Sequence, residues 1–185
     1  MKILLIAMNA KFIHSSLALR SIQTYCAKYA ANIKKIELTI NHYENEILKS
    51  IYEEKPDVLA FSCYIWNMEM ISKLIPTLSK ILPNCKIILG GPEVSFNSEA
   101  LFAENLPIDI VIEGEGEETW YELMNHFVDG SKALKDINGI VYKDHTGAIQ
   151  RNPNREPMDL NKIPFVYDDV AKLDHKIIYY EATRG

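Results

Sequence analysis

The stretch DVLAFSC, residues 57–63, decides the fold of this chain. Val58, Leu59, Ala60 and Phe61 follow one another with no polar residue between them. A strand with one solvent-exposed face alternates apolar and polar residues. A continuous apolar run is typical of a strand that is covered on both faces, as in a parallel sheet. Four more strands are predicted on either side of it, over residues 2–8, 33–40, 86–91 and 108–116.

The intervening segments carry apolar residues at helical spacing. They predict helices over residues 15–30, 45–54, 67–82, 98–104 and 117–127. Ser15 or Ser16 can cap the first helix, and Asn67 the third. Strands that alternate with helices indicate an α/β fold. We predict a flavodoxin-like (Rossmann-like), doubly wound, five-stranded parallel sheet with strand order 2-1-3-4-5.

The pattern changes after Gly130. Residues 137–154 read as a β-hairpin that turns at residues 144–147, and residues 151–169 contain three prolines and read as a linker. Residues 176–185 begin with an apolar, aromatic run that resembles a new strand. We therefore expect an α/β domain over residues 1–130, a hairpin and linker over 131–175, and an isolated strand over 176–185.

The composition argues against several classes of protein. The chain has 185 residues, of which 48% are apolar and 24% charged, with a net charge of -5, so it is globular and lacks the basic stripe of a nucleic-acid reader. No apolar run approaches the ~18 residues of a membrane span. Cys26, Cys63 and Cys85 are dispersed, which favours neither disulfides nor a metal site and suggests the cytoplasm.

Ligands of open parallel sheets bind outside the carboxyl ends of the strands. In this chain Gly90-Gly91-Pro92 follows the fourth strand, Gly114 follows the fifth, and Tyr64 and Trp66 follow the third. The glycines leave the backbone without side chains next to the two aromatic rings, and this predicts a broad, partly apolar binding surface. The plainer interpretations are an ordinary turn at the glycines and a tryptophan that covers the edge of the sheet.

Known nucleotide motifs are missing from these loops. The loop after the first strand contains neither G-x-G-x-x-G nor G-x-x-x-x-G-K-[ST], and Asn9 and Ser62 stand where a phosphorylated receiver domain needs acidic residues. The chain therefore reads as a binder of a large, flat ligand rather than as a catalyst.

Seven motifs together resemble one family. They are IILGGPEVS (87–95), IDIVIEGEGEETW (108–120), INGIVYKDHTGAIQRNPNR (137–155), DLNKIPFVYDD (159–169), YYEATRG (179–185), AKFIHSSLALRSI (10–22) and FSCYIWN (61–67). The first five, which follow one another in this order along the chain, resemble the N-terminal half of cobalamin-binding radical S-adenosylmethionine (SAM) proteins, and the last two resemble one branch of uncharacterised members of that family.

The resemblance implies a cobalamin site at the carboxyl rim of the sheet. The corrin ring would rest on the loops after the fourth and fifth strands and be framed by those after the first and third. The implied cofactor-binding residues are Asn9, Ala10, Ser62, Tyr64, Trp66, Gly90, Gly91, Pro92, Glu93, Glu113, Gly114 and Glu115.

The resemblance also implies a longer parent enzyme. In the family, Thr-Arg-Gly is followed by a C-x-x-x-C-x-x-C segment that holds a 4Fe-4S cluster and SAM. We therefore expect this chain, which is not an enzyme by itself, to be a fragment cut before that motif. Its parent would perform methyl transfer or other radical chemistry on an unactivated carbon, in a radical SAM barrel that the chain lacks. Residues 176–185 would be the first strand of that barrel.

One feature departs from many cobalamin domains. Their D-x-H-x-x-G motif supplies a histidine to cobalt, but this chain has Asn9-Ala10-Lys11, and His14 lies outside that spacing. We expect no histidine ligand from this loop. Two alternatives stay open: a cofactor-less docking or substrate-capping domain of a radical SAM protein, and a stand-alone flavodoxin-like nucleotide-binding domain.

Overall fold

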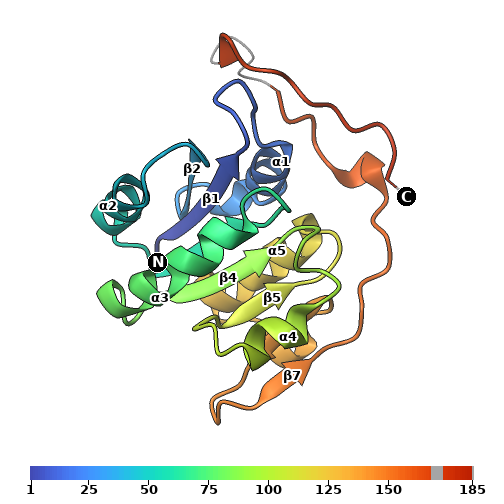
Figure 1. Cartoon of the computed structure of the whole chain (residues 1–185). Helices are drawn as coiled ribbons and strands as arrows, with labels where there is room; N and C mark the ends of the chain where they lie inside the picture. The colour runs from blue at the N-terminus through green and yellow to red at the C-terminus, as the bar shows by residue number, and fades with distance from the viewer. Residues whose placement is uncertain (168–172, 185) are drawn as a thin grey trace.

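The computed structural model describes residues 1–167 and 173–184 (Figure 1). The end of the predicted linker, at residues 168–172, and Gly185 lie outside the described residues. The strands are β1 (Ile3–Asn9), β2 (Ile33–Thr39), β3 (Val58–Ser62), β4 (Lys86–Gly90), β5 (Ile110–Ile112), β6 (Ile140–Lys143) and β7 (Ile149–Arg151). The α-helices are α1 (Leu17–Tyr25), α2 (Glu44–Glu54), α3 (Met68–Ile81), α4 (Ser98–Ala103) and α5 (Glu117–Met124).

The strands form one sheet in the order β2-β1-β3-β4-β5-β6-β7. The first five are parallel, which confirms the predicted order 2-1-3-4-5. The predicted hairpin, β6 and β7, adds two antiparallel strands to the edge of the same sheet, which therefore has seven strands rather than five.

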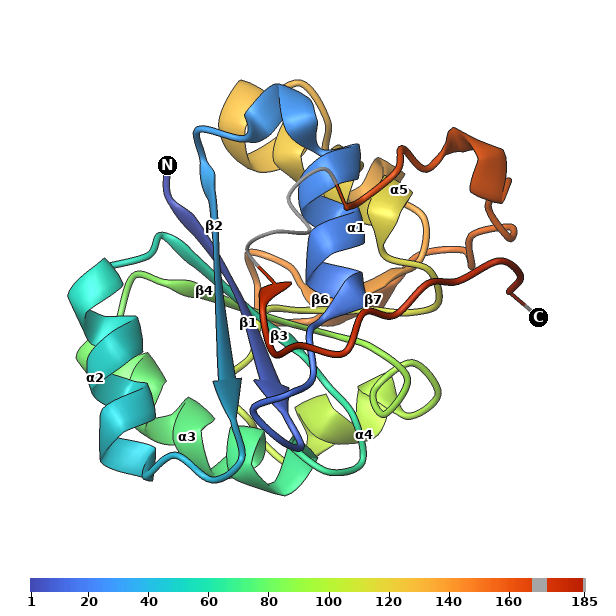
Figure 2. The same ribbon diagram turned by 90° about the horizontal axis from the view of Figure 1, so that it is seen from above.

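Two helical layers cover the sheet (Figure 2). Leu59 and Phe61 point into a core formed with α2, α3 and α4, whereas Val58 and Ala60 point into a second core formed with α1 and α5. Because side chains of a strand alternate between its faces, a strand between two cores is apolar at every position. This arrangement explains the continuous run in residues 58–61.

The core extends beyond Gly130, where the sequence predicted the α/β domain to end. Ile137, Ile140 and Val141 are fully buried and belong to the two cores. The physical reason is pairing: β6 bonds to the edge of β5, so its apolar side chains lie under the same helical layers.

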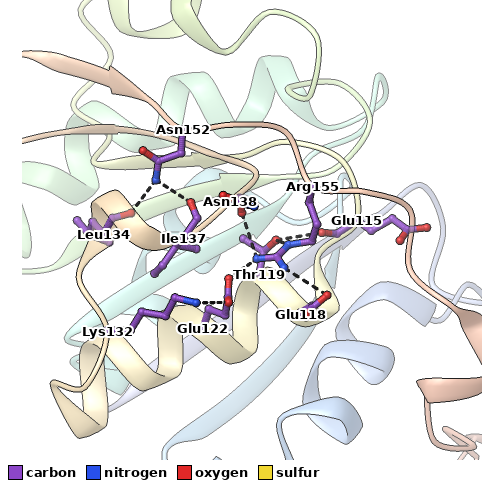
Figure 3. Close-up of polar contacts among 10 residues, drawn as sticks. All are labelled: Glu115, Glu118, Thr119, Glu122, Lys132, Leu134, Ile137, Asn138, Asn152 and Arg155. Carbon is purple, nitrogen blue, oxygen red and sulfur yellow. Dashed lines mark hydrogen bonds and ion pairs between the residues drawn. The ribbon is translucent and has the colours of Figure 1, made fainter.

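The segment after β7 is bound to α5 (Figure 3). The Asn152 amide donates to the carbonyl oxygens of Leu134 and Ile137, at 2.7 Å each. Arg155 donates to the Thr119 hydroxyl at 3.0 Å and pairs with the Glu118 and Glu122 carboxylates. The beginning of the predicted linker is therefore ordered against the domain.

The hairpin is also held by an ion pair at its second strand. Arg151 of β7 donates to Glu113 at 2.6 Å, and the Ser98 hydroxyl donates to the other oxygen of that carboxylate. Glu113 is 8% exposed, whereas the second acidic partner of Arg151, Glu99, has a largely exposed side chain.

We expect Arg151→Ala to lower the free energy of unfolding by about 2 kcal/mol, because it leaves the buried Glu113 carboxylate without its cation. The loss should be smaller than for a fully buried pair, because the Arg151 side chain is 43% exposed. Glu99→Gln removes only the exposed half of the network and should cost less than ~0.5 kcal/mol. Urea denaturation of both variants measures the difference. Equal losses would contradict the importance of the buried pair.

Candidate functional site

A cleft of about 430 Å³ lies at the carboxyl ends of β3, β4 and β5. Its floor includes Ser62, Gly90 and Ile112, which are neighbours in register across the three strands. Its walls come from two helices that pack against the same face of the sheet. The lining residues from these helices are Leu17, Ala18, Leu19, Ser21 and Ile22 of α1 and Glu117 and Trp120 of α5.

Seven of the twelve predicted cofactor-binding residues line this cleft. They are Ser62, Tyr64, Gly90, Gly91, Pro92, Gly114 and Glu115. They come from three loops that are far apart in the sequence, and the parallel sheet brings them to one edge.

The other five predicted residues, Asn9, Ala10, Trp66, Glu93 and Glu113, are not among the lining residues. The Asn9 amide donates to Glu37 and to the His14 carbonyl oxygen, both at 3.0 Å, and thus orders the loop after β1. The Glu113 carboxylate is occupied by Ser98 and Arg151. Ala10 is half-buried and Glu93 is exposed.

Gly91 is required by the backbone itself. Its φ is +116°, and a Cβ at this position would lie 2.5 Å from the Cys63 carbonyl oxygen. Only glycine fits where a positive φ and so close an approach of two backbones coincide. Gly90 differs, because a Cβ there would meet Ile112 at an ordinary 3.5 Å. The backbone therefore requires glycine at position 91 but not at position 90.

Tyr64, which lines the cleft, forms a stacked aromatic pair with Trp66, which does not. Their ring centroids are 4.5 Å apart and their planes differ by 7°. The buried Asn67 amide fixes this loop by accepting from the Tyr64 backbone N–H and donating to the carbonyl oxygens of Met8 and Ser62. Trp66 is 45% exposed and so offers a ring to a ligand outside the cleft.

The structure adds polar residues that the sequence did not indicate as binding residues. The Glu117 carboxylate, 4% exposed, accepts from the Ser21 hydroxyl at 2.6 Å and from both terminal nitrogens of Arg184. Burial opposes ionisation of Glu117, but the hydrogen bonds from Arg184 and Ser21 outweigh it and lower its pKa. Its place at the start of α5 was visible in the sequence, whereas its partners were not.

His14 is not among the lining residues of the cleft. Its Nδ1 is hydrogen-bonded to the Tyr179 hydroxyl, and the two rings stack with centroids 5.9 Å apart. A residue from the C-terminal segment therefore occupies Nδ1, one of the two ring nitrogens of His14.

The three cysteines are free thiols, each next to the end of a different element: Cys26 follows α1, Cys63 follows β3 and Cys85 precedes β4. Burial raises the pKa of Cys26 and Cys63 to about 12, so both are protonated at neutral pH. Within residues 1–167 and 173–184, no group of three His, Cys, Asp or Glu side chains could hold a metal ion. None of the described helices combines the length and apolarity that a membrane crossing requires.

Two methyltransferases are among the proteins that are similar to this chain in sequence. The cobalamin-dependent radical SAM methyltransferase TokK of Streptomyces tokunonensis is 36% identical over 95 residues, which cover 51% of this chain and 14% of TokK. The uncharacterized methyltransferase PH0819 of Pyrococcus horikoshii is 30% identical over 131 residues, or 70% of this chain and 28% of that protein.

The solved structure of OxsB, a cobalamin-dependent SAM radical enzyme with aqua-cobalamin and SAM bound, superposes with a TM-score of 0.75 at 20% identity. The superposition covers 94% of this chain and 25% of OxsB. The chain thus spans less than a third of the length of each of these three proteins.

The family model described as the B12 binding domain matches residues 3–124, a range that runs from β1 to the end of α5 and includes every strand that forms the cleft. This match extends over more than half of the chain, and the motif resemblance pointed to the same family. The chain therefore belongs to the B12-binding domain family.

Proposed function

We propose that this chain binds cobalamin at the carboxyl edge of its sheet and serves as the cofactor module of a radical SAM protein. The observation that carries the proposal is the cleft beside the stacked Tyr64–Trp66 pair. Its floor has no side chain at Gly90, which leaves room for a ligand. Its volume, about 430 Å³, lies within the usual range of small-molecule sites.

The residues present fit the parts of cobalamin. The molecule combines a flat corrin ring with a pendant nucleotide, and this edge offers a rim of small residues beside a mainly apolar cleft. Gly91, Pro92 and Gly114 would hold the ring from the rim, since Gly114 has open space where a Cβ would stand. Ser62 and Gly90 would line the space for the pendant part.

Bound cobalamin supplies a cobalt centre that accepts and transfers alkyl groups. The residues of this chain would bind and orient the cofactor. The apolar walls, such as Leu17 and Trp120, would keep water from the pendant part. The Ser62 hydroxyl would hydrogen-bond to that part, and the Ser21 oxygen, whose proton is donated to Glu117, would accept from it.

The activity of the parent protein belongs to the same proposal. TokK carries the name of a methyltransferase and OxsB that of a SAM radical enzyme. We infer that the parent of this chain also holds a 4Fe-4S cluster and SAM in another part, and that it transfers a methyl group or performs related radical chemistry on an unactivated carbon.

Gel filtration of the purified chain after incubation with hydroxocobalamin tests the proposal. We expect one equivalent of corrin absorbance to elute with the protein. A folded chain that elutes without corrin would refute cobalamin binding and favour the cofactor-less docking domain.

The loop after β1 leads to a separate prediction about cobalt. Because the His14 Nδ1 is hydrogen-bonded to Tyr179 and His14 is not among the residues that line the cleft, His14→Ala should leave the EPR spectrum of bound cob(II)alamin unchanged. Nitrogen hyperfine coupling that is present in the parent chain and lost in this variant would instead identify His14 as a cobalt ligand.

A further inference from the structure

The cleft extends inward from the edge of the sheet, as the register of its strands shows. Ser62 and Gly90 are paired neighbours at the carboxyl ends of β3 and β4. Ala60 lies two residues earlier on β3, roughly 7 Å further into the domain, and is paired with Leu5 of β1. Both Ala60 and Leu5 line the cleft and belong to the core formed with α1 and α5. The cleft therefore reaches from the rim into this core.

The polar side chains with which residues 1–167 line the cleft gather at its outer part. All but Ser21 lie in loops of the carboxyl edge or at the element ends beside them, and Ser21 is bonded at 2.6 Å to Glu117, the first residue of α5. These side chains are Ser21, Ser62, Tyr64, Ser95, Glu115 and Glu117.

The inner end of the cleft is apolar. Leu5 and Ala60 of the sheet and Trp120, one turn into α5, are each at most 5% exposed. The indole N–H of Trp120 is the one polar group of these three side chains, and it donates a hydrogen bond but cannot accept one. A ligand group that needs an acceptor would find none on these side chains.

Such a cleft suits a ligand whose far end is an apolar ring. In the pendant nucleotide of cobalamin the sugar lies nearer the corrin, and a dimethylbenzimidazole, with two methyl groups on its outer ring, comes last. Related natural corrinoids carry a purine such as adenine in its place. At the inner end, the amine and ring nitrogens of adenine would lose their hydrogen bonds to water without replacement, and a buried polar group that stays unpaired is costly.

We propose that this domain selects corrinoids by the base of their pendant nucleotide, accepting dimethylbenzimidazole and disfavouring adenine, with Ala60 as the specificity-determining residue. The inference rests on the proposed function and deepens it by naming the class of corrinoid. Ala60 is the smallest of the three inner side chains, so it leaves room for the base. Its replacement changes the size or polarity of the inner end without altering the rim.

Equilibrium dialysis read by corrin absorbance tests this selectivity with three probes. They are hydroxocobalamin, its adenine analogue adeninylcobamide, and cobinamide, which has no nucleotide. We expect the unmodified chain to bind hydroxocobalamin at least about tenfold more tightly than adeninylcobamide, because the purine leaves polar groups unpaired.

Ala60→Ser is the variant that changes polarity at nearly constant volume. Its hydroxyl can accept a hydrogen bond from the adenine amine, so the preference for hydroxocobalamin should fall at least about threefold. The same two cofactors are compared on both proteins, so any difference between the free cofactors cancels in this change of the ratio.

Ala60→Val is the variant that shortens the cleft. It should weaken hydroxocobalamin binding at least about tenfold and leave cobinamide binding within about twofold, since only the nucleotide reaches the inner end. Ala7→Val is the matched control, because Ala7 is 3% exposed in the same core but is not among the lining residues of the cleft. It should change neither affinity more than about twofold, and thermal denaturation checks that each variant folds.

Equal affinity of the unmodified chain for hydroxocobalamin and adeninylcobamide, or a ratio that Ala60→Ser leaves unchanged, would overturn the selectivity but not cobalamin binding. Equal losses of hydroxocobalamin and cobinamide in a folded Ala60→Val variant would also overturn it. If Ala60→Val does not fold, the nearly isosteric serine variant decides. Failure of the unmodified chain to bind any of the three corrinoids would overturn the proposed function and the selectivity with it.

Discussion

Gly91→Ala should lower the free energy of unfolding by about 3 kcal/mol, the sum of backbone strain at a positive φ and of the displacement of a neighbouring backbone. The added Cβ would lie 2.5 Å from the Cys63 carbonyl oxygen and 3.0 Å from its nitrogen, both of which are main-chain atoms. Main-chain atoms cannot rotate away as a flexible side chain can. Urea denaturation followed by circular dichroism measures the loss.

The matched control is Gly147→Ala in the turn between β6 and β7. Gly147 also has a positive φ, +85°, but no atom lies within 4 Å of its virtual Cβ. This variant should therefore show only the strain, about 1 kcal/mol. Equal losses in the two variants would mean that the contact with Cys63 does not contribute to the loss of stability at position 91. The large expected loss also means that a bulky residue at position 91 cannot separate binding from folding.

Gly90→Leu should weaken cobalamin binding by at least about 100-fold, or roughly 2.7 kcal/mol, while the free energy of unfolding changes by less than ~1 kcal/mol. Gly90 shares the face of its strand with Ile88, which packs in the core formed with α1 and α5, so its side chain would enter the cleft. The fold tolerates a Cβ there, because the nearest atom, in Ile112, is 3.5 Å away.

Gly90→Ala is the graded control, because a methyl group fills far less of the cleft and should weaken binding less than about tenfold. Titration with hydroxocobalamin gives the affinities, and thermal denaturation reports on the fold. Undiminished binding by a folded Gly90→Leu variant would place the cofactor outside this cleft.

The sequence determined the parallel part of the sheet. A run such as residues 58–61 is apolar at every position, and this pattern depends only on which faces of a strand are covered, a property local to each element. For the same reason the helices could be predicted, and Ser16 caps α1 by accepting from the Leu19 N–H, as one of the two serines was expected to do. The carboxyl edge of the sheet then followed from topology, and with it seven of the twelve predicted residues gathered in one cleft.

Only the tertiary structure decided the rest, because it depends on contacts between residues distant in the sequence. The need of the fold for glycine at position 91 comes from the close approach of Cys63, 28 positions earlier in the chain. The hairpin joined the sheet because β5 offered an unpaired edge, which composition alone does not reveal. Glu117 and Arg184 lie 67 positions apart, so neither residue type nor spacing could pair them. The sheet, α5 and the C-terminal segment had to be placed in space before the two charges came together at the cleft.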